Sequence, residues 1–114
     1  MVVEKVSYAE ARAGLRRCRA PAEPPPGVEC FRIDGGRCFV ATETEGDALR
    51  VHAIEGRGVD DVIRAIIESA RRQGFRRVLF RTHRKGMGRF MARYGFEADG
   101  IEPDGMRGFR REFW

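Results

Sequence analysis

This sequence has no long apolar run and very few cysteines. A membrane-spanning helix needs about 20 predominantly apolar residues, and charged residues interrupt every apolar run well before that length. The N-terminal segment carries charges at Glu4 and Lys5 and shows neither an apolar core nor a cleavage site, so we expect no secretory leader. These absences favour a cytoplasmic protein.

The three cysteines, Cys18, Cys30 and Cys38, do not cluster. Their spacing resembles no zinc motif, and we expect no metal site. Cys30 and Cys38 fall on the two arms of a predicted hairpin, where alternation places them on opposite faces of the sheet and prevents a disulfide. We therefore expect all three to be small buried hydrophobic residues in a reducing compartment.

The composition is that of one globular domain. The chain has 114 residues, of which 42% are hydrophobic and 34% charged, which is enough apolar material for a single core. We expect one domain over residues 1–114, with an N-terminal helix and a proline-rich connector over 1–27 and a sheet core over 28–113.

Basic residues gather in one stretch. Between Ser69 and Phe96 there are nine Arg or Lys residues and no acid, whereas the rest of the chain has 13 basic and 17 acidic residues. We call this set the basic block: Arg71, Arg72, Arg76, Arg77, Arg81, Arg84, Lys85, Arg89 and Arg93. If it forms one positive face, it predicts an anionic ligand, an acidic protein surface or nucleic acid as partner. A solvated face that only keeps the protein soluble is the alternative.

The N-terminal part predicts one helix. Ser7 and Glu10 form a capping box, and apolar residues at helical spacing extend the helix to about Arg19. The prolines between residues 21 and 26 end it and form an extended connector.

A three-stranded antiparallel meander is predicted next. Val28–Asp34 and Arg37–Glu43 alternate as strands around a two-residue Gly35-Gly36 turn. The third strand is Ala48–Glu55, in which residues 49, 51 and 53 share a face by alternation.

The second half predicts alternating helices and strands. An apolar stripe from Val59 to Ala70 indicates a helix that Gly74 ends. The elements that follow are a strand over 75–82, a helix over 85–94 and two strands over 96–99 and 106–113. Strands 48–55 and 75–82 should be parallel neighbours, because the helix between them is long enough for a right-handed crossover. The fold class is therefore α+β, a mixed sheet flanked by helices.

This order of elements resembles the GNAT N-acetyltransferase superfamily in a trimmed form. The resemblance covers roughly residues 28–113, and its best segment runs from Val59 through the Gly74 exit to the Tyr94-Gly95-Phe96 ending. It implies a GNAT-like sheet and an N-acyltransferase that uses acetyl-CoA. Some small phage and prophage proteins resemble this chain, which suggests that it is phage-encoded. In that case it would be virion-associated.

The resemblance also implies a cofactor site. In the family, the loop after the fourth strand holds the pyrophosphate of acetyl-CoA on backbone amides and a helix N terminus. The matching segment here is Gly56-Arg57-Gly58-Val59, and Arg81, Arg84 and Lys85 would help to hold the phosphates. The glycines of this chain are at positions 56 and 58, whereas the family's three loop glycines would match positions 55, 57 and 59, one residue out of step. Asp60 and Asp61 follow directly, and we expect them to repel a pyrophosphate.

His52, Glu55 and Tyr94 are the candidate catalytic residues under this resemblance. His52 or Glu55 would be the general base, although alternation places them on opposite faces unless a bulge intervenes. The family's proton-donating tyrosine falls at Met91, which cannot donate a proton, and its asparagine falls at Arg84. Tyr94, one helical turn from Met91, is the remaining candidate acid, with core packing as the alternative.

Three functions stay open. The first is an acetyl-CoA-dependent N-acyltransferase, whose activity is retained, weakened or lost. The second is a silent GNAT-fold phage structural or regulatory protein that binds an acidic partner. The third is a nucleic-acid binder. A homo-oligomer or a phage assembly is compatible with each. A V-shaped gap between strands 51–55 and 75–81 would favour the enzyme, because the family seats the pantetheine arm there. Burial of Phe75, Phe80 and Phe90 would disfavour nucleic acid, because single-strand binders expose aromatic rings.

Overall fold

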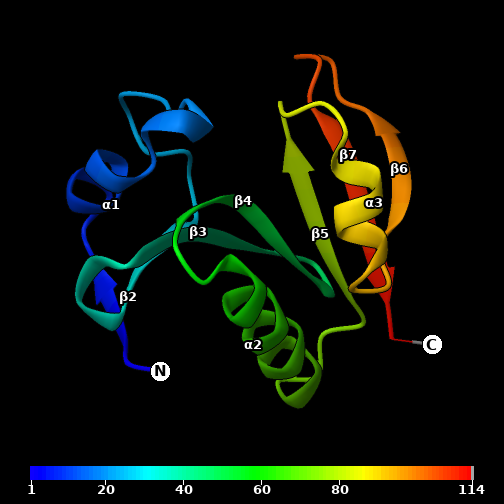
Figure 1. Cartoon of the computed structure of the whole chain (residues 1–114), viewed down its shortest axis with the longest axis horizontal. Helices are drawn as coiled ribbons and strands as arrows, with labels where there is room; N and C mark the ends of the chain where they lie inside the picture. Colours follow the sequence, from blue (N-terminus) through cyan, green and yellow to red (C-terminus); the bar gives the residue numbers. More distant parts are fainter. Residues whose placement is uncertain (114) are drawn as a thin grey trace.

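Seven strands form one sheet in the computed structural model, which describes residues 1–113 (Figure 1). In chain order the elements are β1 (Val3–Val6), α1 (Tyr8–Gly14), the 3₁₀ turn η1 (Arg16–Cys18), β2 (Val28–Ile33), the 3₁₀ turn η2 (Asp34–Gly36), β3 (Cys38–Glu45), β4 (Ala48–Gly56), α2 (Val59–Arg72), β5 (Arg77–Thr82), α3 (Met87–Ala92), β6 (Glu97–Ile101) and β7 (Arg107–Glu112). The strand order is β1-β2-β3-β4-β5-β7-β6. The predicted α+β class with a mixed sheet is confirmed.

Strands β4 and β5 are the parallel neighbours that the sequence predicts. Ala48 pairs with Arg77 and Val51 with Phe80, and α2 connects the two strands. The other neighbours in the sheet are antiparallel. Helix α2 buries Val62, Ile63, Ile67 and Ala70 against the sheet. Burying a Val or Ile side chain contributes roughly 1.5–3 kcal/mol, and this stripe fixes the N terminus of α2 at the end of β4.

The two faces of the sheet carry separate cores. On one face, which we call the α2 face, α2 and the segment around α3 pack over Val40, Val51 and Phe80. On the other, the α1 face, α1 packs over Ala41 and Ala53. Figure 1 shows α1 at one end of the sheet and α3 near the other.

The cysteines follow this division. Cys38 lies in the α2-face core and Cys30 in the α1-face core, so the predicted placement on opposite faces is confirmed. Cys18 is only partly buried, because it belongs to η1 at the edge of the α1-face core, and the prediction of full burial is wrong for it.

The N-terminal segment differs from the prediction in two ways. Residues 3–6 form the edge strand β1, paired with β2, where no strand was expected. Ser7 caps α1 as predicted, its hydroxyl accepting the amide of Glu10 at 3.2 Å. The helix, however, ends at Gly14 and not near Arg19, because the chain turns into η1 and Arg19 adopts a left-handed conformation with φ of 54°.

The β2–β3 connection is longer than the predicted Gly35-Gly36 turn. Four residues, 34–37, separate Ile33 from its partner Cys38, and they include η2. Asp34 holds this loop closed, because its carboxylate accepts the amide of Val2 at 2.8 Å and pairs with Arg37 at 2.9 Å. These contacts lower the pKa of Asp34, the hydrogen bond from Val2 most of all.

The C-terminal boundaries also shift. Helix α3 begins at Met87 and has six residues, so Lys85 lies in the preceding loop and not in the helix as predicted. Gly86, with φ of 77°, precedes the helix, which explains the late start. The last two strands are present as expected, and β7 lies between β5 and β6.

Candidate functional site

A β-bulge at His52 divides β4. Ala41 of β3 pairs with Ala53, but the next residue, Thr42, pairs with Val51, which leaves His52 as the extra residue. Val51 therefore packs in the α2-face core, whereas Ala53 packs in the α1-face core. The prediction that residues 49, 51 and 53 share a face is wrong because strict alternation ends at this bulge.

Strands β4 and β5 part at the same point. Their ladder ends at the pair Val51–Phe80, although β4 continues to Gly56 and β5 to Thr82. Figure 1 shows the two strands diverging beyond it. We call this separation the splay. It lies where a V-shaped gap would favour an enzyme over a silent domain, although residues 77–80 of β5 are still paired with β4.

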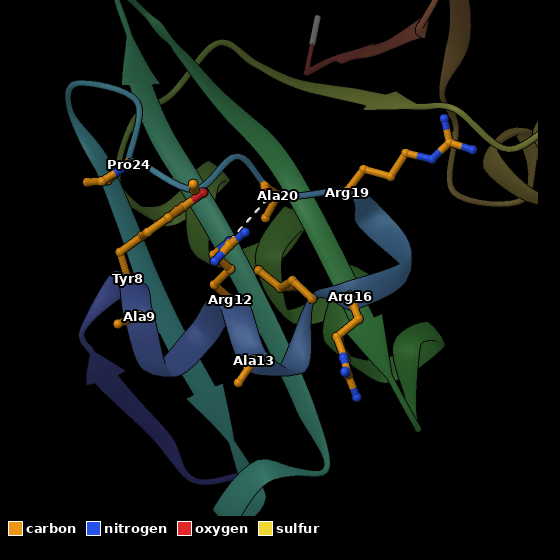
Figure 2. Close-up of a pocket in the computed structure, with 10 residues that line it drawn as sticks. Tyr8, Ala9, Arg12, Ala13, Arg16, Arg19, Ala20 and Pro24 are labelled. Atoms are coloured by element: carbon orange, nitrogen blue, oxygen red, sulfur yellow. Dashed lines mark hydrogen bonds between the residues drawn. The ribbon is translucent and has the colours of Figure 1, made fainter.

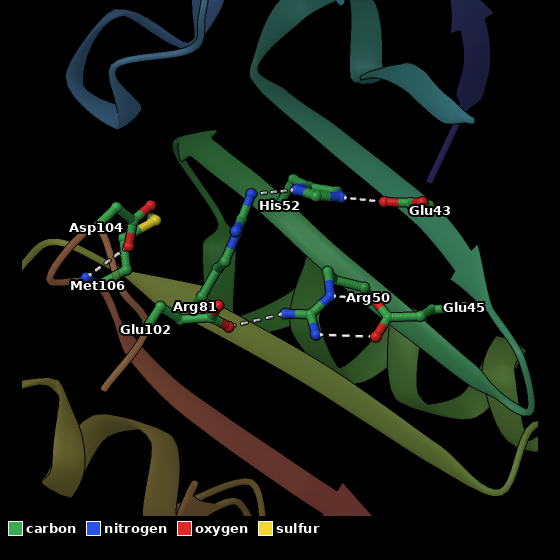
Figure 3. A network of polar contacts seen from close by, with 8 residues as sticks. All are labelled: Glu43, Glu45, Arg50, His52, Arg81, Glu102, Asp104 and Met106. Atoms are coloured by element: carbon green, nitrogen blue, oxygen red, sulfur yellow. Dashed lines mark hydrogen bonds and ion pairs between the residues drawn. The ribbon is translucent and has the colours of Figure 1, made fainter. Parts of the chain in front are cut away.

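Each ring nitrogen of His52 contacts a charged side chain at the start of the splay (Figure 3). Its Nε2 lies 2.7 Å from Oε1 of Glu43, and its Nδ1 lies 2.8 Å from Nη2 of Arg81. A guanidinium can only donate a hydrogen bond, so Nδ1 is the acceptor and Nε2 carries the hydrogen that Glu43 accepts. Arg81 therefore reaches from β5 to β4 where the backbone ladder has ended.

Arg50 forms a second polar cluster beside His52 (Figure 3). It pairs with Glu45 at 2.5 Å and with Glu102 at 3.4 Å. The hydrogen bond to Glu45 raises the pKa of Arg50, and the same bond lowers the pKa of Glu45. Glu102 follows β6, so this cluster ties the β6–β7 loop to β4 on the side where His52 lies.

Glu55 lies on the α1 face with His52, because the bulge intervenes between them. Its Oε1 accepts the backbone amides of Arg17 at 2.6 Å and of Cys18 at 3.2 Å. Glu55 therefore caps η1 and fixes it against β4. Of the two candidate bases, Glu55 is bonded to backbone amides, whereas His52 is bonded to the side chains of Glu43 and Arg81.

The backbone of β4 beyond the bulge faces the splay at alternate residues. The amide of Arg57 donates to the carbonyl of Arg37, and antiparallel alternation then turns the backbone groups of Ile54 and Gly56 away from β3. The carbonyl of Ile54 accepts the thiol of Cys18 at 3.4 Å. Burial, first of all, raises the pKa of that thiol to about 11.

An arginine that the sequence did not indicate as a site residue, Arg37, lies against the loop between β4 and α2. Gly58, with φ of 73°, is the N-cap of α2. Its missing Cβ would lie 2.7 Å from Nη1 of Arg37, so that guanidinium lies against the loop. Asp60 and Asp61 are exposed in the first turn of α2. Arg37 comes from a distant hairpin, and only the pairing of Cys38 with Gly56 could have indicated its position.

Tyr94 lies away from the other catalytic candidates. It packs in the α2-face core with 5% of its surface exposed, edge-on to Phe90 and beneath the guanidinium of Arg64. Met91, at the position of the family's tyrosine, is fully buried. These contacts match the packing alternative for Tyr94.

The basic block divides along β5. Arg71 and Arg72 lie at the end of α2, before β5, whereas Arg84 and Lys85 are exposed in the loop after it. Of the expected phosphate ligands, Arg81 contacts His52, and Arg84 donates its backbone amide to Thr82 Oγ1. Among the aromatic residues of this region, Phe80 is buried and Phe75 and Phe90 are partly buried.

A pocket lies between α1 and the proline-rich connector (Figure 2). The hydroxyl of Tyr8 donates to the carbonyl of Pro21 at 2.6 Å, and Nε of Arg12 donates to that of Ala20 at 3.3 Å. Figure 2 shows Arg16 and Arg19 pointing away from each other. These arginines therefore form no convergent anion site.

Within residues 1–113, no three His, Cys, Asp or Glu side chains are grouped as metal ligands would be. No helix in the same range is long and apolar enough to cross a membrane.

No protein-family model matches the chain, and no curated protein sequence matches it. Several solved structures, however, match the structure of this chain. The ribosomal-protein-S18-alanine N-acetyltransferase of Escherichia coli has a TM-score of 0.65 at 14% identity, over 97% of this chain and 92% of its own. An acetyltransferase from Bacillus subtilis in complex with CoA has a TM-score of 0.67 at 13% identity, over 98% of each chain. For Ard1 from Thermoplasma volcanium the TM-score is 0.66 at 14% identity, over 99% of this chain and 97% of its own.

The chain has the GNAT acetyltransferase fold. At these identities the likeness shows the fold alone, and the match extends to almost the full length of all three proteins. These three proteins come from cellular organisms and give no support to a phage origin, which stays a prediction.

Proposed function

We propose that this GNAT-fold chain is an N-acyltransferase that uses an acyl-CoA, acetyl-CoA being the simplest such donor. The observation that carries the proposal is the end of the β4–β5 ladder at the bulge that carries His52. A continuous ladder would leave no room between the strands, whereas the splay leaves backbone groups of β4 without a strand partner.

The residues around the splay fit an acyl-CoA. The amide of Ile54 and the backbone of Gly56 face the splay and could pair with the amide groups of a pantetheine arm, whereas the carbonyl of Ile54 already accepts the thiol of Cys18. Gly58 and Val59, at the N terminus of α2, offer backbone amides to a diphosphate. Arg37, which also pairs with Asp34, lies beside this loop. An acyl-CoA held there supplies a thioester, whose acyl carbon bonds to the amine nitrogen as its bond to sulfur breaks.

In this proposal His52 takes the proton of the amine. Its Nδ1 is the basic nitrogen, because Nε2 carries the hydrogen that Glu43 accepts at 2.7 Å. Glu43 orients the ring and stabilises the imidazolium that forms when Nδ1 takes a proton. From His52 the proton can pass to solvent or to the leaving sulfur. A positioned general base of this kind contributes typically about 10²–10⁴-fold in rate.

The test measures binding and transfer separately. Titration calorimetry with acetyl-CoA reports binding, and mass spectrometry reports acetylation of a panel of amines. We expect His52→Gln to keep acetyl-CoA binding and to lose roughly 10²–10⁴-fold in transfer rate. His83→Gln is the matched control, because His83 is the only other histidine and is exposed in the loop after β5. Failure of the wild type both to bind and to transfer would overturn the proposal.

A second candidate is a CoA-binding domain without catalysis. Met91, fully buried at the position of the family's proton-donating tyrosine, favours it. Acetyl-CoA binding by the wild type with no transfer to any amine would select this candidate.

A further inference from the structure

Arg81 differs from its neighbours on the sheet in having no carboxylate partner. Arg50 pairs with Glu45 and Glu102, and Arg77 pairs with Asp47 and Glu112. Within residues 1–113, the side chain of Arg81 forms no ion pair, and its only hydrogen bond is the one from Nη2 to His52. Its Nε is buried without a partner. A guanidinium that is partly removed from water normally meets an anion, because an unmet donor costs desolvation energy.

The present partner of Arg81 also conflicts with the role of His52. The lone pair of Nδ1 accepts the hydrogen of Arg81 and cannot accept a proton from an amine at the same time. His52 can act as a base only after Arg81 has moved to another acceptor. Neither Glu43 nor Glu45 is free to take it, since Glu43 is bonded to His52 and Glu45, whose pKa Arg81 also helps to lower, is bonded to Arg50.

We propose that Arg81 binds a carboxylate of the substrate, and that the acceptor is an amine with a nearby carboxylate, as in an α-amino acid. This proposal rests on the proposed function and names its substrate class. A carboxylate accepts two parallel hydrogen bonds from the fork of a guanidinium. Arg81 then exchanges His52 for the carboxylate, and Nδ1 becomes free beside the amine of the same molecule.

The spacing suits such a molecule. Nη2 of Arg81 and Nδ1 of His52 are 2.8 Å apart. An α-amino acid carries its amine and its carboxylate on one carbon, so both groups reach two sites this close together. An amine without a carboxylate would leave Arg81 on His52 and the base masked. The arrangement therefore selects the acceptor and activates the base in one step.

The carboxylate could also belong to the acyl group, as in a succinyl thioester. The shared chemistry is a carboxylate at Arg81, and two arms of one experiment separate the sources. The first arm compares phenylalanine with phenethylamine as acceptors for acetyl-CoA. The second arm compares succinyl-CoA with acetyl-CoA, using phenethylamine as the acceptor.

Three variants accompany the wild type. Arg81→Gln removes the charge, and Arg81→Lys keeps it but loses the fork. Arg77→Gln is the matched control, because Arg77 lies on the same strand and the same face and also has a buried Nε without a hydrogen bond, yet it already pairs with two carboxylates. Far-UV circular dichroism shows that each variant is folded.

We expect the wild type to prefer phenylalanine over phenethylamine by roughly 10- to 100-fold in kcat/KM, the range that hydrogen bonds to a charged group supply. Arg81→Gln should lose this preference in two ways: the KM for phenylalanine rises, and the rate on phenethylamine rises because Nδ1 of His52 is no longer masked. Added guanidinium should restore the preference. Arg77→Gln should keep the preference. A preference that appears only in the succinyl-CoA arm and disappears in Arg81→Gln would assign the carboxylate to the donor. A preference in neither arm, or one that persists in Arg81→Gln, would overturn the proposal.

A titration without acyl-CoA keeps the proposal testable if no transfer is seen. The ¹⁵N resonances of the His52 ring should shift when phenylalanine is added, because Nδ1 loses the hydrogen of Arg81. Phenethylamine, and phenylalanine added to Arg81→Gln, should leave them unchanged. Absence of transfer with this shift present would overturn the proposed function alone. Absence of the shift would overturn the role of Arg81.

Discussion

Gly56 lies so close to the backbone of β3 that a Cβ at position 56 would be 2.6 Å from the Cα of Cys38, and nearer still to the carbonyl oxygen of Arg37. Real Cβ atoms do not approach other heavy atoms this closely, and the neighbouring atoms belong to the backbone. With φ of 139°, position 56 also has a conformation that other residues rarely adopt. The close pairing of these two strands therefore requires a glycine at the mouth of the splay.

Gly56→Ala should lower the free energy of unfolding by about 1–3 kcal/mol, because it combines the clash with a strained φ. Urea unfolding followed by circular dichroism measures this change. Gly46→Ala is the control, because Gly46 also has a positive φ, of 61°, but its Cβ would meet nothing within 4 Å. An equal loss in the two variants would mean that strain alone, and not the contact with Cys38, makes Gly56 necessary.

Asp60 and Asp61 should limit the affinity for acyl-CoA. Both are exposed in the first turn of α2, beside the loop proposed to hold the diphosphate. Replacing both with Asn removes two negative charges there and should tighten acetyl-CoA binding several-fold, measured by calorimetry, with a smaller gain at high salt. It should also lower the stability of the helix by about 0.3–1 kcal/mol per residue. Glu68→Gln, at an exposed position later on α2, should change neither quantity noticeably.

Cys18 should react slowly with thiol reagents while η1 stays on β4. Its pKa of about 11, against an ordinary 9.0, leaves roughly a hundredth of the usual thiolate at pH 8. Because the folded pKa is the higher one, the protonated thiol stabilises the fold below about pH 9, and this contribution disappears as the pH rises through 11.

Glu55→Ala removes the acceptor of the Arg17 and Cys18 amides and should speed iodoacetamide labelling of Cys18, detected by mass spectrometry of the digested protein. Glu68→Ala, with the same loss of a carboxylate at an exposed site, should not. Equal labelling rates in both variants would show that Glu55 does not hold η1 in place.

Local patterns predicted the central unit of the fold. The stripe from Val59 to Ala70 repeats at the helical period, and Gly74 follows where the helix must end, so α2 could be placed from neighbouring residues alone. The crossover rule then made β4 and β5 parallel. Residues 3–6 were not recognised as a strand, because β1 is a short, mostly exposed edge strand with little buried surface to pattern its sequence.

The candidate site depends on contacts that no local pattern contains. The bulge at His52 arises from the pairing of β3 with β4, and it alone turns His52 and Glu55 to the same face. The engagement of Glu55 with η1 joins residues 37 and 38 positions apart. Arg81 was expected to hold phosphates because of its charge, whereas its neighbour across the splay is a histidine on another strand.

The exposed end of the basic block should attract anions through Arg84 and Lys85. Arg77 is already paired with acids, Arg81 is bonded to His52 and Arg71 lies over the ring of Phe113, whereas Arg84 and Lys85 are exposed in the loop that precedes α3. Helix α3 has only six residues, so we assign the attraction to the two side-chain charges and not to a helix end.

Binding of heparin and of a single-stranded oligothymidylate, measured by fluorescence anisotropy at about 50 and 200 mM salt, tests this expectation. Each contact with a phosphate of single-stranded DNA contributes roughly 0.7 to the slope of log K against log salt. Arg84→Ala combined with Lys85→Ala should therefore flatten the slope for the oligonucleotide by roughly 1.4 and weaken binding to both polyanions. Arg71→Ala combined with Arg72→Ala removes the same charge at the opposite end of β5 and should flatten it less. Binding that ignores salt, or equal effects of the two double variants, would leave the block as a solvated surface without a preferred anion site.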